Sequence, residues 1–111
     1  EEAVKALLAP DCRYYDAGKV KTTNIQEFID YLRRARMPYE SIEIEIDNIV
    51  AEGNWVAVRY AYHSVLSDHY RRPEYIEDSL NEGLIVVPAM ADFLIEDGNI
   101  AEMWRYIPAG S

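Results

Sequence analysis

Few side chains in this sequence could perform chemistry, and the clearest is Asp16, which follows the aromatic pair Tyr14-Tyr15. A carboxylate in poorly solvated, aromatic surroundings can accept a proton as a general base, and His63 could supply the accompanying acid. Cys12 has no neighbouring base to activate its thiol, so we interpret it as a small buried hydrophobe. His63 and His69 lack a third ligand at a useful spacing, so no metal site is expected.

The sequence contains no glycine-rich phosphate loop, no Ser-His-Asp order and no paired-cysteine motif. Its formal charge is −9, from 20 acidic and 11 basic residues. Such a charge repels phosphate backbones and anionic lipid surfaces, so neither nucleic acid nor a membrane is an expected partner. No run approaches the roughly 18 apolar residues of a membrane span. The single cysteine fits a reducing compartment, and we expect a cytoplasmic protein.

The elements that would position Asp16 begin with two helical segments. Glu1–Ala9 carries apolar residues at helical spacing and ends before Pro10. Asn24, with Glu27 three residues later, predicts the N-cap of a second helix that ends near Met37, before Pro38. Between these helices, residues 11–16 read as a short strand that ends at Ala17-Gly18. Its period of two places Cys12, Tyr14 and Asp16 on one face.

From Ser41 onward the hydrophobic period changes from helical to two. Ile42, Ile44 and Ile46 alternate with acidic residues, which predicts a strand with one face in the core. The run 55–65 is apolar on both faces, so we expect a second subunit to cover one of them in a homodimer. Strands 84–95 and 99–107 flank the turn Glu96-Asp97-Gly98, which predicts a tight hairpin. Residues 67–83 read either as a surface excursion or as a lid over a pocket.

This order of elements predicts one α+β domain over residues 1–111, in which a curved antiparallel sheet wraps around helices and leaves a conical cavity. Because the chain begins without Met, we expect its first helix to lack its start. The order and five short stretches resemble the nuclear transport factor two-like superfamily with its cystatin-like cone. Within it, the SnoaL-like polyketide cyclases and the ketosteroid isomerase relatives are most similar. The stretches are ALLAPDC (6–12), WVAVR (55–59), VPAM (87–90), IEDGNI (95–100) and MWRY (103–106).

The resemblance covers nearly the whole chain but carries over only part of each relative's catalytic set. Asp16 matches the general base of the ketosteroid isomerases, whose protonated acid falls at Ala91. Arg59 matches the arginine of the limonene epoxide hydrolases, whose two acids fall at Ala61 and Tyr106. The acid that the cyclases carry in the last strand has no counterpart here. The fold also hosts binding modules that are not enzymes.

The resemblance and the strand alternation together imply three catalytic candidates at the cavity: Asp16, Arg59 and His63. They also imply substrate-binding residues that line it, namely Tyr14, Phe28, Ala91, Phe93, Trp104 and Tyr106, beside the small residues Cys12 and Ala89.

Two functions follow from these candidates. The first is an isomerase or cyclase that moves a proton at Asp16 on a small hydrophobic, cyclic or polyketide-like molecule, without metal or organic cofactor. The alternative is a binding module for a small ligand or another protein, in which Asp16 and Arg59 form a structural ion pair. An open cavity lined by Asp16 and Trp104 would support a ligand site. A cone filled by Tyr14, Phe28 and Phe93 would indicate a scaffold.

Overall fold

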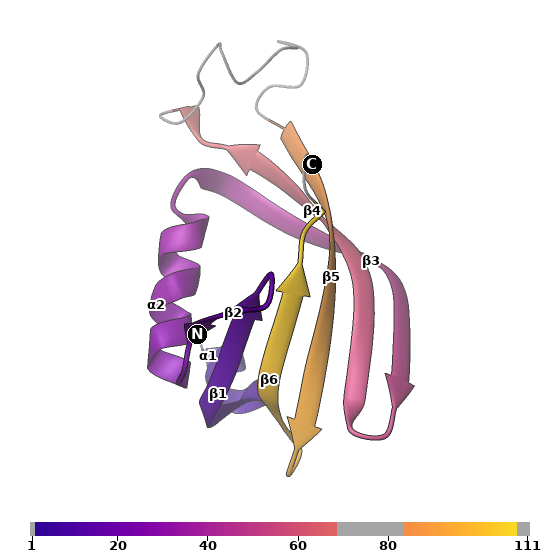
Figure 1. Ribbon diagram of the computed structural model, residues 1–111. Coiled ribbons are helices and arrows are strands. Elements are labelled where there is room, and N and C mark those ends of the chain that lie inside the picture. The colour runs from indigo at the N-terminus through magenta and orange to yellow at the C-terminus, as the bar shows by residue number, and fades with distance from the viewer. Residues whose placement is uncertain (1, 69–83, 109–111) are drawn as a thin grey trace.

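The computed structural model describes residues 2–68 and 84–108, which form two helices and a six-stranded sheet (Figure 1). The predicted α+β class is confirmed. Most of the predicted surface excursion or lid at 67–83 lies outside the described residues. Within those residues, neither helix has the length and apolar character needed to cross a membrane. The elements are α1 (Glu2–Leu7), β1 (Leu8–Asp16), β2 (Lys19–Thr22), α2 (Ile25–Arg36), β3 (Tyr39–Glu52), β4 (Trp55–Leu66), β5 (Leu84–Glu96) and β6 (Asn99–Tyr106).

The sheet has the order β2-β1-β6-β5-β4-β3, so the first and last strands in the sequence lie side by side within it. The β1–β6 pair is parallel and the other neighbours are antiparallel. The predicted sheet was antiparallel throughout, and this one pair differs because β1 and β6 are joined through the rest of the domain rather than by a hairpin. The sheet is curled but not closed. In Figure 1 the upper parts of β3 and β4 bend over towards α2. A shift of register between Ile46 and Asn48 in β3 accompanies this bend.

Two tight turns fix the hairpins on either side of the β1–β6 pair. Asp97 and Gly98 both have positive φ, 51° and 80°, as a two-residue hairpin turn requires, so the predicted β5–β6 hairpin is confirmed. Ala17 and Gly18 have φ of 52° and 83° and join β1 to β2. The sequence reading placed this turn but did not predict β2. This strand has only four residues and is largely exposed, so it shows no hydrophobic alternation.

The predicted helix α2 is confirmed, including its cap. The Glu27 backbone N–H donates to Asn24 Oδ1 at 2.9 Å, and the Thr23 N–H donates to Glu27 Oε1 at 2.8 Å. The helix packs chiefly against β1 and β2. The first helix ends at Leu7 rather than Ala9, because Leu8 already pairs with Ile100 of β6.

The core has two parts that meet at Phe93. One lies between the helices, β1 and β6 and includes the buried residues Cys12, Tyr14 and Met103. The other lies on β4 and β5 around Tyr60, Ala89 and Ala91. We call the sheet face that carries these residues the inner face and the opposite one the outer face.

The prediction that Ile44 and Ile46 belong to the core is wrong for the single chain, where they are 57% and 56% exposed. They share the inner face with Tyr62 and Tyr60, which they pair with in register. However, β3 is the edge strand, and α2 packs mainly at the other end of the sheet. The inner face of β3 is therefore an uncovered apolar strip.

Candidate functional site

An ion pair between Asp16 and Arg105 is the centre of the candidate site. The parallel register of β1 and β6 places the two residues directly beside each other. Arg105 Nη2 donates to Asp16 Oδ2 at 2.8 Å, and the two side chains are only 22% and 23% exposed. Burial tends to lower the pKa of Arg105, but its hydrogen bonds with Asp16 and Tyr62 outweigh that effect and leave the pKa raised. The guanidinium therefore remains charged throughout the physiological range.

Four tyrosines surround the Arg105 guanidinium. Nη1 donates to the Tyr62 hydroxyl at 3.3 Å and Nη2 donates to the Tyr31 hydroxyl at 3.4 Å. The Tyr62 hydroxyl forms a 2.9 Å hydrogen bond with that of Tyr60. The Tyr14 ring lies 5.6 Å from the guanidinium carbon, within the range of a cation–π contact. We call these six residues, Asp16, Arg105 and the four tyrosines, the Asp16 cluster.

Two tyrosines of the Asp16 cluster, Tyr14 and Tyr60, are neutral hydrogen-bonding groups at ordinary pH. Burial is the main cause that raises the pKa of Tyr14, and a hydrogen bond with Tyr31 adds to it. Burial likewise raises the pKa of Tyr60, together with its hydrogen bond to Tyr62. Neither phenol can serve as a base near neutral pH, so Asp16 is the group in this cluster that can accept a proton.

The structure brings several predicted site residues together on the inner face. Tyr14 and Phe28 meet edge to face, with ring centroids 5.4 Å apart. Ala91 is 4% exposed beside Tyr60, and Phe93 contacts both parts of the core. Tyr14 shares its face of β1 with Asp16, and Ala91 pairs in register with Arg105, the ion-pair partner of Asp16. Tyr14, Phe28 and Phe93 also pack in the same part of the core. This is the arrangement expected of a scaffold.

The predicted ion pair between Asp16 and Arg59 is wrong, because Arg59 lies on the outer face. Tyr60 and Tyr62 point inward, so strand alternation directs Arg59 and His63 outward. Arg59 is exposed, and His63 Nε2 lies 3.8 Å from Glu45 Oε2. The sequence analysis had assigned the face of β4 that carries Arg59 and His63 to the cavity.

The same alternation corrects the prediction that Trp104 and Tyr106 face the cavity. Arg105 of β6 points inward, so Trp104 and Tyr106 lie on the outer face. The Trp104 ring stacks on Tyr15 at a centroid distance of 3.7 Å, and its Nε1 donates to Glu102 at 3.0 Å. Tyr106 is 41% exposed. Asp16 and Trp104 are therefore on opposite sides of the sheet and cannot line one cavity.

A surface hollow of about 480 Å³ has no member of the Asp16 cluster in its lining. It is lined by Glu43, Ile44, Glu45, His63 and Leu84. Across residues 2–68 and 84–108, no three His, Cys, Asp or Glu side chains come together in a way that could hold a metal ion. Cys12 is fully buried, and burial raises the pKa of its thiol above the ordinary value, so the thiol is not activated as a nucleophile. Within the described residues, we therefore take the Asp16 cluster as the candidate site.

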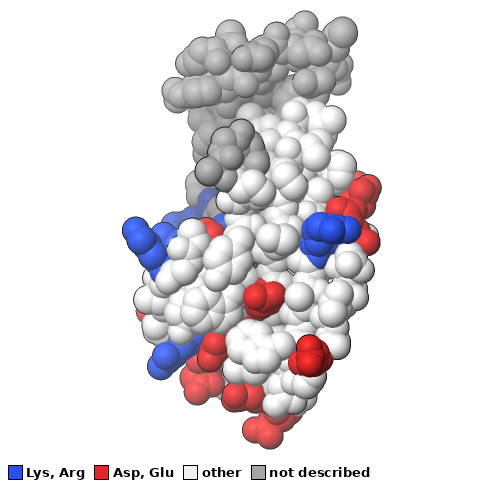
Figure 2. Space-filling model, turned by 45° about the vertical axis from the view of Figure 1, so that its right-hand side comes forward, with Lys and Arg blue, Asp and Glu red and all other residues white. Residues whose placement is uncertain are grey.

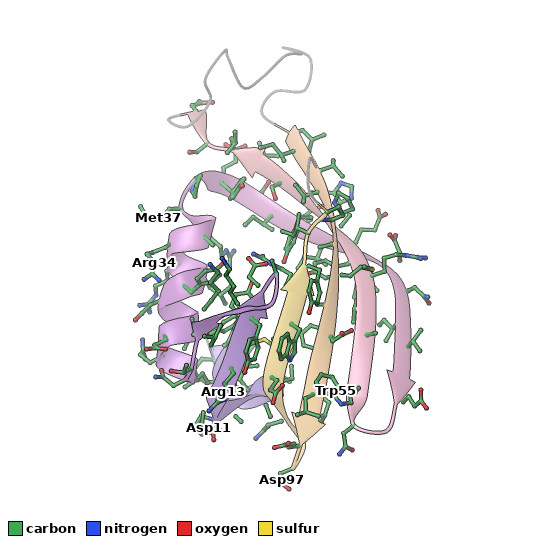
Figure 3. The ribbon with its side chains drawn as sticks, in the orientation of Figure 1. Asp11, Arg13, Arg34, Met37, Trp55 and Asp97 are labelled. Atoms are coloured by element: carbon green, nitrogen blue, oxygen red, sulfur yellow. The ribbon has the colours of Figure 1, made fainter. Side chains whose placement is uncertain are left out.

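The sequence reading missed four members of this cluster: Arg105, Tyr31, Tyr60 and Tyr62. A usable signal existed for the two tyrosines of β4, because they alternate with Val56 and Val58 on the more uniformly apolar face of that strand. Arg105 lies between Trp104 and Tyr106, and the aromatic pair was taken as the inward face. In Figure 3, Trp55 and Asp97 lie near the lower end of the sheet, and Arg34 and Met37 lie on the side of α2 turned away from it.

Comparison with known proteins agrees with this architecture. The family model of the SnoaL-like domain matches residues 1–103. No curated protein matches the sequence.

Solved structures share the fold at low sequence identity. A candidate SnoaL-like polyketide cyclase from Jannaschia sp. CCS1 superposes with a TM-score of 0.76 at 16% identity, over 96% of this chain and 70% of that one. IdmH, a candidate polyketide cyclase from Streptomyces antibioticus, superposes with a TM-score of 0.75 at 16% identity, over 96% of this chain and 78% of IdmH. A protein with a ketosteroid isomerase-like fold from Catenulispora acidiphila superposes with a TM-score of 0.74 at 18% identity, over 96% of this chain and 73% of that one. The chain belongs to the SnoaL-like domain family.

Proposed function

We propose that this protein is an isomerase or cyclase that binds a small hydrophobic, cyclic or polyketide-like molecule on the inner face of the sheet and moves a proton at Asp16. The observation that carries the proposal is a carboxylate only 23% exposed, held at 2.8 Å by Arg105 among aromatic side chains. Membership of the SnoaL-like family and the two candidate polyketide cyclases among its structural neighbours support the substrate class.

Arg105 fixes the carboxylate in a productive orientation. It binds Oδ2, and within the described residues no hydrogen bond is recorded at Oδ1. Oδ1 can therefore take a proton from a carbon next to a substrate carbonyl. The C–H bond breaks, an O–H bond forms on Asp16, and the electron pair passes to the carbonyl oxygen as an enolate. The Arg105 charge, no longer balanced by the carboxylate, is then balanced by the enolate.

The second step distinguishes the two reaction types. In an isomerisation, Asp16 returns the proton to a different carbon of the same enolate. In a cyclisation, the enolate carbon attacks a second carbonyl, and the new alkoxide takes the proton back from Asp16. Both routes use the side chains of this chain alone and leave Asp16 ionised for the next cycle.

The exchange of carbon-bound hydrogen for deuterium tests the proposal without knowledge of the natural substrate. We expect the protein to accelerate exchange in 2-tetralone, a bicyclic ketone, in deuterated buffer, as followed by NMR. The Asp16→Asn variant should lose about 100-fold to 10,000-fold of this acceleration, the usual contribution of a positioned base. Equal exchange rates with the wild type and the variant would exclude Asp16 as the base.

A binding module without catalysis is the second candidate, and one observation favours it. The Asp16 carboxylate already has the Arg105 guanidinium as a partner, as in an ion pair with a structural role. Mass spectrometry of the protein under native conditions would identify a co-purifying guest. Retained binding of 2-tetralone without any exchange above background would establish this candidate over the enzyme.

We further propose that a second copy of the chain covers the outer face. Apolar side chains on this face of neighbouring strands are about half exposed, among them Val50, Trp55, Val86 and Met90. On the face turned to the viewer in Figure 2, acidic side chains gather towards the lower end, with a broad uncharged area above them. Sedimentation velocity at micromolar concentration should give a dimer, and Met90→Lys should shift it to monomer. A wild-type monomer would refute the homodimer. The expected cytoplasmic location remains a prediction.

A further inference from the structure

We propose that the free edge of β3 docks another protein, which adds to the sheet an extended strand of alternating basic and apolar residues. β3 lies at one end of the sheet (Figure 1), and within the described residues it pairs with β4 alone. An edge strand presents a row of unpaired backbone N–H and C=O groups, to which a further strand can hydrogen-bond. This edge is separate from the Asp16 cluster, and its role does not depend on the reaction proposed there.

Two rows of side chains alternate along this edge. Ile44 and Ile46 lie on the inner face and are 57% and 56% exposed. Glu43 and Glu45 are exposed on the outer face, where Glu43 pairs in register with the outward His63. Each row of an added strand would lie beside one of these rows. The residues that it places on the inner face are therefore apolar, because they cover the two isoleucines.

The acidic row determines the charge of the partner. β3 has fourteen residues and contains no Lys or Arg. Within the described residues, the ion pair recorded for this row joins Glu45 to His63 at 3.8 Å, and a histidine is charged only when it is protonated. Opposite charges across neighbouring strands attract and like charges repel. A basic segment is thus favoured, whereas β3 of a second copy, laid antiparallel on this edge, would bring two acidic rows together.

The surface hollow gives a basic side chain a place to bind. It measures about 480 Å³ and is lined by both glutamates of the acidic row, with Ile44, His63 and Leu84. Leu84 offers an apolar surface to the methylene stem of Lys or Arg, and the carboxylates accept hydrogen bonds from its charged end. Acidic residues on an edge also keep two copies apart. That role accounts for the outer row but not for the exposed isoleucines of the inner row.

NMR titration with a designed peptide tests the docking site. The probe is a capped peptide in which Lys and Val alternate over about seven residues, enough to span residues 41–47. We expect the largest shifts at the backbone amides of residues 41–47 and of their partners in β4. A peptide of the same composition, with its Lys and Val residues in two separate blocks, should bind about tenfold more weakly because it cannot match both rows.

Charge reversal tests the recognition itself. The double variant Glu43→Lys/Glu45→Lys should bind the Lys–Val peptide at least about tenfold more weakly than the wild type. It should also bind a Glu–Val peptide that the wild type rejects, a gain that an unfolded chain could not give. The matched control is Glu52→Lys/Glu96→Lys, which changes the net charge equally at exposed positions outside residues 41–47. The control should retain most of the affinity of the wild type.

Three results would overturn the docking site. The first is a wild type that does not bind the Lys–Val peptide, or that binds it with shifts away from β3. The second is an equal loss of affinity in the two double variants, which would show only a general attraction to an acidic protein. The third is a set of shifts at residues 41–47 that depends on protein concentration without peptide, which would identify a second copy as the occupant.

Discussion

The ion pair between Asp16 and Arg105 should contribute measurably to stability, and a double-mutant cycle tests this with Asp16→Asn, Arg105→Gln and the two combined. Both side chains are less than a quarter exposed, and their contact of 2.8 Å is a charge-assisted hydrogen bond. Such bonds contribute about 1.5–3 kcal/mol. Each single variant also leaves a poorly solvated charge without its partner, so we expect each to lower the free energy of unfolding by about 2–3 kcal/mol.

The double variant should cost less than the sum of the two single variants, because it removes both charges together. The expected coupling energy is about 1.5–3 kcal/mol. Urea unfolding at neutral pH, followed by tryptophan fluorescence, provides the measurement. Trp104 adjoins Arg105 in β6 and stacks on Tyr15 across the outer face, so it reports loss of the sheet without touching the mutated groups.

The chain contains a matched control in the pair Asp30 and Arg33 of α2. Their contact is 3.5 Å, and the side chains are 45% and 60% exposed. An exposed pair of this kind couples by at most about 0.5 kcal/mol, because water screens both charges. A coupling energy for Asp16 and Arg105 as small as that of the control pair would refute the conclusion that the buried pair organises the site.

Further predictions concern alkaline pH, the helix cap and the hairpin turn. Tyr14 and Tyr60 keep their protons in the folded state above the ordinary tyrosine pKa, so stability should fall by about 1.2 kcal/mol per phenol between about pH 9.5 and pH 11. In Tyr60→Phe, urea unfolding should show a smaller fall in stability over this pH range than in the wild type. A fall equal to that of the wild type would contradict the role of the Tyr60 phenol. Asn24→Ala should lower the free energy of unfolding by about 1 kcal/mol, because its side chain no longer accepts the hydrogen bond from the first turn of α2. Chemical unfolding measures this loss, with Asn24→Asp, which keeps the cap, as the control. Gly98→Ala should cost about 1–2 kcal/mol in the same assay because its φ is 80°, and an unchanged midpoint would show that the turn relaxes.

Local patterns determined most of the elements of this protein. The alternation of Ile42, Ile44 and Ile46 predicted a strand, and Asn24 with Glu27 predicted the start of α2. The Asp97-Gly98 step predicted the hairpin between β5 and β6. Each of these features depends on residues that lie close together in the sequence, so the local sequence is enough to predict it. The sequence also marked Asp16 as the carboxylate on the same strand face as Tyr14, and the structure has both residues there.

Only the tertiary structure decided which groups meet Asp16. Strand alternation shows that Arg105 and Trp104 face opposite ways, but it does not show which of them faces inward. That choice depends on the pairing of β1 with β6, whose partners Asp16 and Arg105 are separated by 89 positions. The twist and register of the whole sheet also brought Tyr60 and Tyr62 inward and sent Arg59 and His63 to the outer face. A shift of one residue in register reverses every side chain of a strand. No hairpin turn joins β1 to β6, so long-range packing sets the register of that pair.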